Sequence, residues 1–167
     1  MFQNGKNITM SELIMLCGIP TSGKSTYVEK LKKLDYWKDA VVLSTDNYIE
    51  KQAQRLGLTY NQVFDDVIKD ATRELEMEFN WSKSKGRNII WDQTNLSVKT
   101  RKKKLSKLPS IYKRGVVYFT VSLEDALERN NHREGKFIPE SILKRMYEQF
   151  AIPTIEEGFD YVEKVES

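Results

Sequence analysis

Short apolar segments alternate with longer amphipathic ones along the chain, and the boundaries fall at glycines, prolines or polar clusters. Buried strands are expected over residues 11–19, 40–44, 87–91 and 115–122. Helices are expected over residues 24–34, 60–83, 97–108, 123–131 and 140–150. The tail, residues 159–165, either adds a strand or lies across the domain. Strands that alternate with helices predict an α/β fold with a mainly parallel sheet and helices on both faces.

The helix expected over residues 60–83 has the clearest pattern in the chain. Its apolar positions recur close to every 3.6 residues, which is typical of a helix with one buried face: Val63, Val67, Ala71, Leu75 and Phe79. Gly86 is expected to end it as a C-cap. In parallel sheets of this kind, ligands bind at the carboxyl ends of the strands, where most polar clusters of this sequence also fall.

Composition narrows the class of protein. The 167 residues suffice for one domain, 1–167, and carry a mild net charge of +3. No apolar run approaches the roughly 20 residues that a membrane helix needs. The segment from Met1 to Ser11 is polar and lacks the apolar core of a signal peptide. Cys17, the single cysteine, excludes an internal disulfide and is expected to be a small buried residue. A cytoplasmic protein without membrane contact is expected.

A glycine-rich segment links the first expected strand to the first helix. It matches the Walker A pattern at every fixed position and continues into Thr26: Gly18, Ile19, Pro20, Thr21, Ser22, Gly23, Lys24 and Ser25. The glycines allow the backbone N–H groups to turn toward phosphate oxygens at a helix N-terminus. Lys24 is expected on the β- and γ-phosphates of ATP, and the Ser25 hydroxyl on Mg²⁺. No Asn-Lys-x-Asp segment for reading guanine is present, which argues against a GTPase.

Two aspartates follow expected strands at the same edge of the sheet. A kinase needs a carboxylate to accept the proton of the acceptor hydroxyl, and Asp46 follows the second strand. Its alternative role is to cap a helix over residues 47–54. Asp92 ends the third strand and is a candidate for Mg²⁺ or for the acceptor, or else an ordinary turn residue.

Two further segments carry positive charge. Arg129 and Arg133 lie four residues apart and share a face if their helix continues. The polar segment around them, which runs on through residues 132–139, fits a short helical lid that supplies these arginines. A solvated helix end is the alternative. The helix over residues 97–108 has six cations that suit nucleic-acid phosphates or simply a solvated surface: Lys99, Arg101, Lys102, Lys103, Lys104 and Lys107.

Taken together, these residues resemble the kinase domain of the 5′-hydroxyl polynucleotide kinases, within the P-loop kinase superfamily, of phages and of the eukaryotic polynucleotide kinase/phosphatases. The resemblance covers residues 13–161, nearly the whole chain. It rests on residues 18–26, on Asp46, on Asp92-x-Thr94-Asn95, on Arg129-Asn130 with Arg133, on residues 139–146 and on Gln149-Phe150-x-x-Pro153-Thr154-x-x-Glu157-Gly158-Phe159. A wider group of small P-loop kinases shares the last two segments.

The resemblance implies a role for each matching residue. Lys24, Ser25 and Thr26 would hold ATP and Mg²⁺, Asp46 would be the general base, and Arg133, supported by Arg129, would contact the donor phosphates. Asp92, Thr94 and Asn95 would lie on the substrate side, with Asp92 also a candidate metal ligand. Where phage enzymes hold the acceptor's phosphate with an arginine, three residues after the base, this sequence has Ile49. Lys51 or Arg55 are candidates to replace that arginine.

Three functions are therefore compared. The leading hypothesis is ATP-dependent phosphorylation of the 5′-hydroxyl end of DNA or RNA. The second is a related kinase for another hydroxyl, such as a hydroxymethylated base in phage DNA or a small metabolite, which Ile49 favours. The third is a nucleotide-dependent binding module without acceptor chemistry. Lys24, Ser25, Asp46 and Arg133 favour an enzyme, because a binding module need not keep all four.

Overall fold

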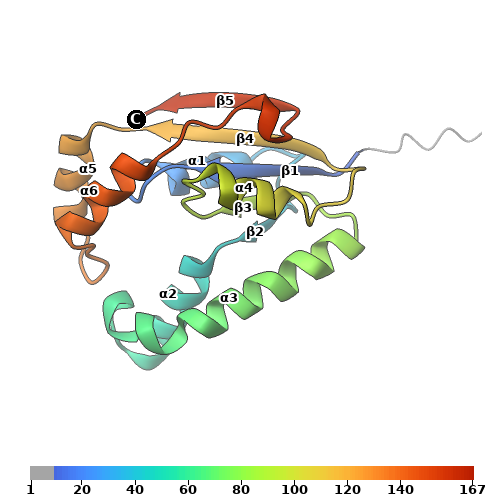
Figure 1. Ribbon diagram of the computed structural model, residues 1–167. Coiled ribbons are helices and arrows are strands. Elements are labelled where there is room, and N and C mark those ends of the chain that lie inside the picture. The colour runs from blue at the N-terminus through green and yellow to red at the C-terminus, as the bar shows by residue number, and fades with distance from the viewer. Residues whose placement is uncertain (1–9) are drawn as a thin grey trace, which may run out of the picture.

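A five-stranded sheet with helices on both faces forms the protein, as the computed structural model in Figure 1 shows. The structure describes residues 10–167, so most of the polar segment from Met1 to Ser11 lies outside the described residues. The strands are β1 (Glu12–Cys17), β2 (Val41–Leu43), β3 (Ile89–Asp92), β4 (Lys113–Thr120) and β5 (Tyr161–Glu166). Their order is β2-β3-β1-β4-β5, and all four neighbouring pairs run parallel. The predicted α/β class is confirmed, and the tail adds a strand.

Five of the α-helices confirm the expected segments to within a few residues, whereas α2 was considered only as an alternative, over residues 47–54. They are α1 (Lys24–Lys32), α2 (Thr45–Leu56), α3 (Tyr60–Ser84), α4 (Val98–Leu105), α5 (Leu123–Asn131) and α6 (Glu140–Gln149), followed by the short 3₁₀ helix η1 (Ile155–Glu157). Within residues 10–167, no helix has the length and apolarity needed to cross a bilayer. Figure 1 shows α5 and α6 beyond the carboxyl ends of the strands, the edge where ligands of such sheets bind.

Alternate side chains of the central strand supply the two cores. Leu13, Met15 and Cys17 of β1 pack in one cluster with Leu75 and Phe79 of α3 and with part of α4. The intervening residues, Ile14 and Leu16, pack in a second cluster with α1 on the opposite face. This alternation is the two-residue period of a strand that is buried on both sides. Cys17 is fully buried, as expected, and burial raises the pKa of its thiol to about 11.

Helix α2 begins in a way that corrects one alternative. Ser44, not Asp46, is its N-cap, and the Ser44 hydroxyl accepts a hydrogen bond from the Asn47 N–H at 3.3 Å. Ser and Asp are both common caps, so the sequence did not distinguish between them. Ile49 is completely buried where α2 packs against α3, beside Val63. Because Ser44 caps the helix, Asp46 has no capping role. Ile49 faces the protein interior.

Helix α4 does not present six cations to solvent. Arg101 is fully buried, and its Nε and Nη2 atoms each donate to a carboxylate oxygen of Glu157 at 2.7 Å. Lys104 also turns inward: its Nζ donates to Gln93 Oε1 at 2.7 Å and lies 4.6 Å from the ring centre of Trp91. Burial lowers the Lys104 pKa to about 7. The exposed cations of this segment are Lys99, Lys102, Lys103 and Lys107.

Asn95 joins the same buried network and is not available to a substrate. Its side chain is 2% exposed and its φ of 48° is left-handed, a conformation that asparagine tolerates better than most residues. Its Nδ2 atom donates to the Leu16 carbonyl at 2.6 Å, and its own carbonyl accepts from the Cys17 thiol and from Arg101 Nη1. The predicted substrate contact is therefore wrong. Asn95 instead ties the end of β1 to the segment after β3.

Breaking the buried ion pair should destabilise the fold strongly. Arg101→Met leaves the Glu157 carboxylate buried without its partner, so we expect the free energy of unfolding to fall by about 3–5 kcal/mol in urea denaturation. The matched control, Lys102→Met, changes an exposed lysine on the same helix and should stay within about 0.5 kcal/mol of the unmodified protein. Equal stabilities of the two variants would contradict this role for the pair.

Candidate active site

A cleft of about 890 Å³ opens at the carboxyl ends of the strands. Its volume lies within the range of roughly 300–1,000 Å³ that is typical of sites for small ligands. Most residues singled out in the sequence line it: Pro20, Thr21, Gly23, Lys24, Ser25, Thr26, Asp46, Asp92, Thr94, Arg129 and Arg133. Gly18, Ser22 and Asn95 do not line it. One cavity therefore brings together predicted residues from four separate parts of the chain.

The glycine-rich segment, called the P-loop from here on, is shaped by two glycines. A Cβ atom on Gly18 would lie 2.7 Å from Ser22 Oγ and 3.1 Å from Phe119 Cβ, so no larger residue fits. Gly23 has a φ of 98° and is the N-cap of α1. The Gly18 N–H donates to the Thr94 carbonyl at 2.9 Å, which fixes the P-loop against the segment after β3. The P-loop is thereby positioned at the N-terminus of α1, where helix N–H groups favour phosphate binding.

Lys24 lies inside this loop. Its Nζ atom donates to the carbonyls of Gly18 at 2.9 Å and Ile19 at 2.8 Å. Burial lowers the Lys24 pKa to about 8, although the carboxylates of Asp92 and Asp46 act in the opposite direction. These two carbonyls accept hydrogen bonds from the Lys24 ammonium group, which could instead donate to phosphate oxygens when a nucleotide binds.

Asp46 has hydrogen-bonding partners on both carboxylate oxygens. The Tyr60 hydroxyl donates to Oδ1 at 2.7 Å, and Lys136 Nζ lies 3.0 Å from Oδ2. Burial acts to raise the Asp46 pKa, but Lys136, Tyr60 and Arg133 outweigh it and hold the pKa below its ordinary value. The pKa of Tyr60 is raised by burial and by Asp46, so its hydroxyl stays protonated and donates. Asp46 is thus ionised and positioned in the cleft.

Asp92 is another carboxylate that lines the cleft. Burial raises its pKa, and the nearby Asp46 adds to this effect while Lys24 opposes it. Ser25 lines the same cleft. A hydroxyl and a carboxylate are both hard oxygen ligands, so Ser25 and Asp92 could hold Mg²⁺ together with phosphate oxygens.

The two arginines line the cleft, but they do not share a helix face. Helix α5 ends at Asn131, so Arg133 lies beyond it. Arg129 Nη1 donates to the Thr21 carbonyl at 3.0 Å and to the Ser167 hydroxyl. Arg133 Nη1 is buried and has no hydrogen-bond partner among residues 10–167. A guanidinium nitrogen left unpaired beside a P-loop fits a phosphate oxygen.

The lid segment, residues 132–139, is docked against the start of α3. The Asn61 N–H donates to the Gly135 carbonyl at 3.0 Å, and Asn61 Nδ2 donates to the Phe137 carbonyl at 2.8 Å. Asn130 holds the other end through two hydrogen bonds with Ile138, of 2.7 and 3.1 Å. The lid segment is therefore fixed on both sides of Lys136.

Sequence reasoning missed Tyr60, Lys136 and Glu50 as members of the site. Lys136 Nζ contacts Glu50 Oε1 at 2.5 Å in addition to Asp46. Tyr60 is the first residue of α3, and its ring centre lies 4.7 Å from the same ammonium group. Each is an ordinary surface residue in the sequence, and only the polar character of the lid segment indicated Lys136.

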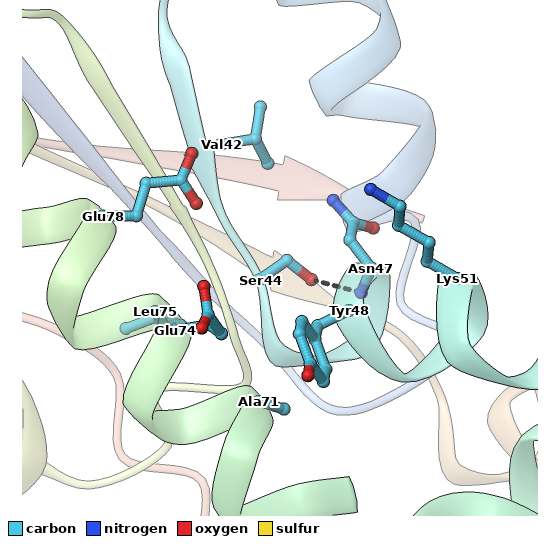
Figure 2. A pocket seen from close by; sticks show the side chains of 9 residues that line it. All are labelled: Val42, Ser44, Asn47, Tyr48, Lys51, Ala71, Glu74, Leu75 and Glu78. Carbon is cyan, nitrogen blue, oxygen red and sulfur yellow. Dashed lines mark hydrogen bonds between the residues drawn. The ribbon is translucent and has the colours of Figure 1, made fainter.

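The candidates to replace the arginine absent at position 49 lie outside the cleft. Figure 2 shows Lys51 on α2 at a separate small cavity of about 200 Å³, opposite Glu74 and Glu78 of α3. Arg55 is exposed, and its Nε atom donates to Gln52 at 3.0 Å. Neither side chain lines the large cleft, so neither takes the place of that arginine in this arrangement.

Comparison with known proteins places this geometry in a family. A family model described as an AAA domain matches residues 13–153, which is most of the chain. The chain belongs to this AAA domain family.

Curated relatives of this AAA domain include proteins of different kinds. Heterogeneous nuclear ribonucleoprotein U-like protein 2 of Homo sapiens is 29% identical, and the match covers 96% of this chain and 22% of that protein. Bifunctional polynucleotide phosphatase/kinase of Schizosaccharomyces pombe is 24% identical, with 92% and 33% covered. L-seryl-tRNA(Sec) kinase of Methanococcus maripaludis is 28% identical, with 89% and 56% covered. The chain thus spans between about a fifth and just over half of the length of these relatives.

Solved structures show the same fold. A chain of the PezAT chromosomal toxin–antitoxin system of Streptococcus pneumoniae has a TM-score of 0.71 at 17% identity, with 98% of this chain and 71% of that chain covered. A gluconokinase from Sinorhizobium meliloti has a TM-score of 0.59 at 18% identity, with 94% and 83% covered. The fold of this AAA domain is that of P-loop kinases, and kinases of this type are among its relatives.

The low pKa of Lys24 should make nucleotide affinity depend on pH. Phosphate charge raises the Lys24 pKa in the complex, so binding takes up a proton above about pH 8, the pKa of the ligand-free protein. We expect the affinity for Mg²⁺ and a non-hydrolysable ATP analogue to be level from about pH 7 to 8 and to fall up to about tenfold per unit above that. Calorimetric titration measures this. The Lys24→Met variant should bind the analogue weakly, with an affinity that does not fall above about pH 8. The control Lys30→Met should keep both the affinity and its fall with pH.

Proposed function

We propose that this chain is a single-domain kinase, residues 1–167, that transfers the γ-phosphoryl group of Mg²⁺-bound ATP to a hydroxyl acceptor. The observation that carries the proposal is Asp46, a carboxylate without a capping role in the same cleft as the P-loop lysine. The P-loop, Lys24, Ser25 and Thr26 would hold the phosphates, and Ser25 with Asp92 would hold Mg²⁺. The metal would neutralise charge that develops on the phosphate oxygens.

The reaction then needs few groups of the protein. The acceptor oxygen forms a bond to the γ-phosphorus, the bond to the oxygen that bridges to the β-phosphate breaks, and ADP leaves with that electron pair. Asp46 takes the proton of the acceptor hydroxyl. Arg133, whose Nη1 atom lacks a partner among the described residues, would stabilise the transferring group. Arg129 would support it from the P-loop side, where it contacts Thr21.

The acceptor that we propose is the 5′-hydroxyl end of DNA or RNA. Support comes from the motif resemblance over residues 13–161 and from the relative in Schizosaccharomyces pombe that is named a polynucleotide phosphatase/kinase. Lys99, Lys102 and Lys103 of α4 are exposed and could attract nucleic-acid phosphates. This role is narrower than the sequence predicted, because Arg101 and Lys104 belong to the interior.

One observation favours a second candidate, a kinase for another hydroxyl such as a modified base or a small metabolite. Ile49 is buried, and Lys51 and Arg55 lie outside the cleft, so none of these three positions supplies a cation to an acceptor phosphate. Glu50 and Asp65 line the cleft, and their carboxylates would repel an acceptor phosphate. Relatives named for a seryl-tRNA and for gluconate fit acceptors beyond a nucleic-acid end.

The Asp46→Asn substitution should distinguish a role of Asp46 as the base from a role in nucleotide binding. The amide keeps the shape of the side chain but accepts no proton, so we expect kcat to fall about 10²–10⁴-fold while the KM for ATP stays within about threefold. Steady-state kinetics at saturating acceptor measure both values. The control Asp160→Asn changes a surface aspartate outside the cleft and should leave them unchanged. A loss expressed mainly in ATP binding would instead indicate a metal-binding role for Asp46.

A panel of acceptors with γ-labelled ATP should identify the substrate. We expect label on 5′-hydroxyl oligonucleotides, and a KM that rises steeply with salt because bound cations displace condensed counterions, with a slope of about −0.7 per phosphate for single strands. Replacing Lys99, Lys102 and Lys103 by Ala should flatten that slope and leave the KM for ATP unchanged. Label only on modified-base duplex, nucleosides or sugars would favour the second candidate. ATP binding without label on any acceptor would favour a binding module.

A further inference from the structure

Lys136 occupies an unusual position for a lysine without an assigned role. Its ammonium group contacts Asp46 Oδ2 at 3.0 Å and Glu50 Oε1 at 2.5 Å, and it lies 4.7 Å from the ring centre of Tyr60. The Lys136 side chain is 21% exposed, whereas the side chains of Asp46 and Glu50 are 49% and 52% exposed. The lysine is thus more enclosed than either of its carboxylate partners, and it contacts the carboxylate that would take the acceptor's proton.

This contact is unfavourable for a base. An ammonium group beside a carboxylate favours the ionised form and lowers its proton affinity, so Asp46 is a weaker base while Lys136 contacts it. Tyr60 is fixed at the first turn of α3 and donates to the other oxygen. Of the two partners of Asp46, the one that can leave is Lys136.

The backbone around Lys136 limits how it can leave. The carbonyls of Gly135 and Phe137, on either side of it, both accept hydrogen bonds from Asn61. The lid segment is therefore held to α3 at both neighbours, and the movement falls to the long side chain of Lys136. A lysine has four flexible carbons and three donors, so it can exchange partners without any change of the backbone.

We propose that Lys136 is a catalytic residue: it contacts Asp46 and Glu50 in the ligand-free protein and moves to the transferring phosphoryl group when both substrates are bound. The acceptor oxygen must lie within hydrogen-bond reach of Asp46, and the γ-phosphorus about 3–3.5 Å beyond that oxygen. The ammonium group, 3.0 Å from Asp46, is already next to that place. Its departure strengthens the base at the step in which the phosphoryl group needs the charge. The inference rests on the proposed kinase function.

Other charged groups near Asp46 do not replace Lys136. The titratable groups that face Asp46 are Tyr60 on α3, Glu50 on α2, Lys24 on α1, Asp92 on β3, and Lys136 and Arg133 of the lid segment. Lys24 is held by two backbone carbonyls of the P-loop. Without Lys136, Asp46 would keep Tyr60 and a more distant Arg133, and two carboxylates would oppose its ionisation.

Three variants test the inference. Lys136→Met removes the charge and keeps the length, Lys136→Arg keeps the charge, and Lys144→Met is a control for a surface lysine paired with Glu140 outside the cleft. We expect Lys136→Met to lower kcat about 10²–10³-fold, with the KM for ATP within about threefold, as for loss of one donor to a developing charge. Lys136→Arg should recover at least about tenfold of that loss, and Lys144→Met should match the unmodified protein.

Two pH measurements separate this role from a purely structural one. The acid limb of kcat/KM, which reports the base in the free enzyme, should move upward by about one unit in Lys136→Met. Carbon-13 NMR titration of the Asp46 carboxyl in ligand-free protein should show the same upward shift, and it needs no acceptor. An unchanged kcat, or a higher one, in Lys136→Met would overturn the phosphoryl contact. An unchanged Asp46 titration would overturn the resting contact, even if the unmodified protein labels no acceptor and the kinase proposal fails.

Discussion

The buried ion pair between Arg101 and Glu157 is the interaction on which the rest of the site depends. It joins α4 to η1, two segments 56 residues apart, and the same guanidinium group donates to the Asn95 carbonyl at 2.9 Å. Asn95 Nδ2 in turn donates to the Leu16 carbonyl near the end of β1, two residues before the P-loop starts at Gly18. A buried pair of this kind adds little net stability compared with apolar packing, but neither partner tolerates loss of the other. The position of the P-loop thus depends on groups that no nucleotide touches.

Within the cleft, the protein's own groups occupy the places of ligands. Lys24 donates to two P-loop carbonyls, and Lys136 contacts two carboxylates, so both ammonium groups are paired before any phosphate arrives. Arg133 differs, because one of its buried nitrogens has no partner among the described residues. Lys24 and Arg129 both contact carbonyls of the P-loop, whereas the carboxylates of Asp46 and Glu50 are paired with Lys136. The positive charge at the P-loop suits the phosphates of a nucleotide donor.

Local pattern was enough to predict most of the fold, because strands and helices follow from periods of two and 3.6 residues. It was also enough for the P-loop, whose residues are contiguous. What local pattern did not resolve depends on partners distant in the chain. Arg101 and Lys104 look like surface cations until Glu157 and Gln93 are placed beside them. Lys136 looks like a solvated lid residue until Glu50, 86 residues away, is in contact with it.

The central claim is that Asp46 faces the γ-phosphate of a nucleotide held by the P-loop. A crystal structure with Mg²⁺ and a non-hydrolysable ATP analogue tests it most directly. The account predicts Lys24 and Arg133 on the γ-phosphate, and the Asp46 carboxylate across from it with room for one hydroxyl oxygen, about 3–3.5 Å from phosphorus. A γ-phosphate that points away from Asp46, or an Asp46 carboxylate bound directly to the metal, would contradict it.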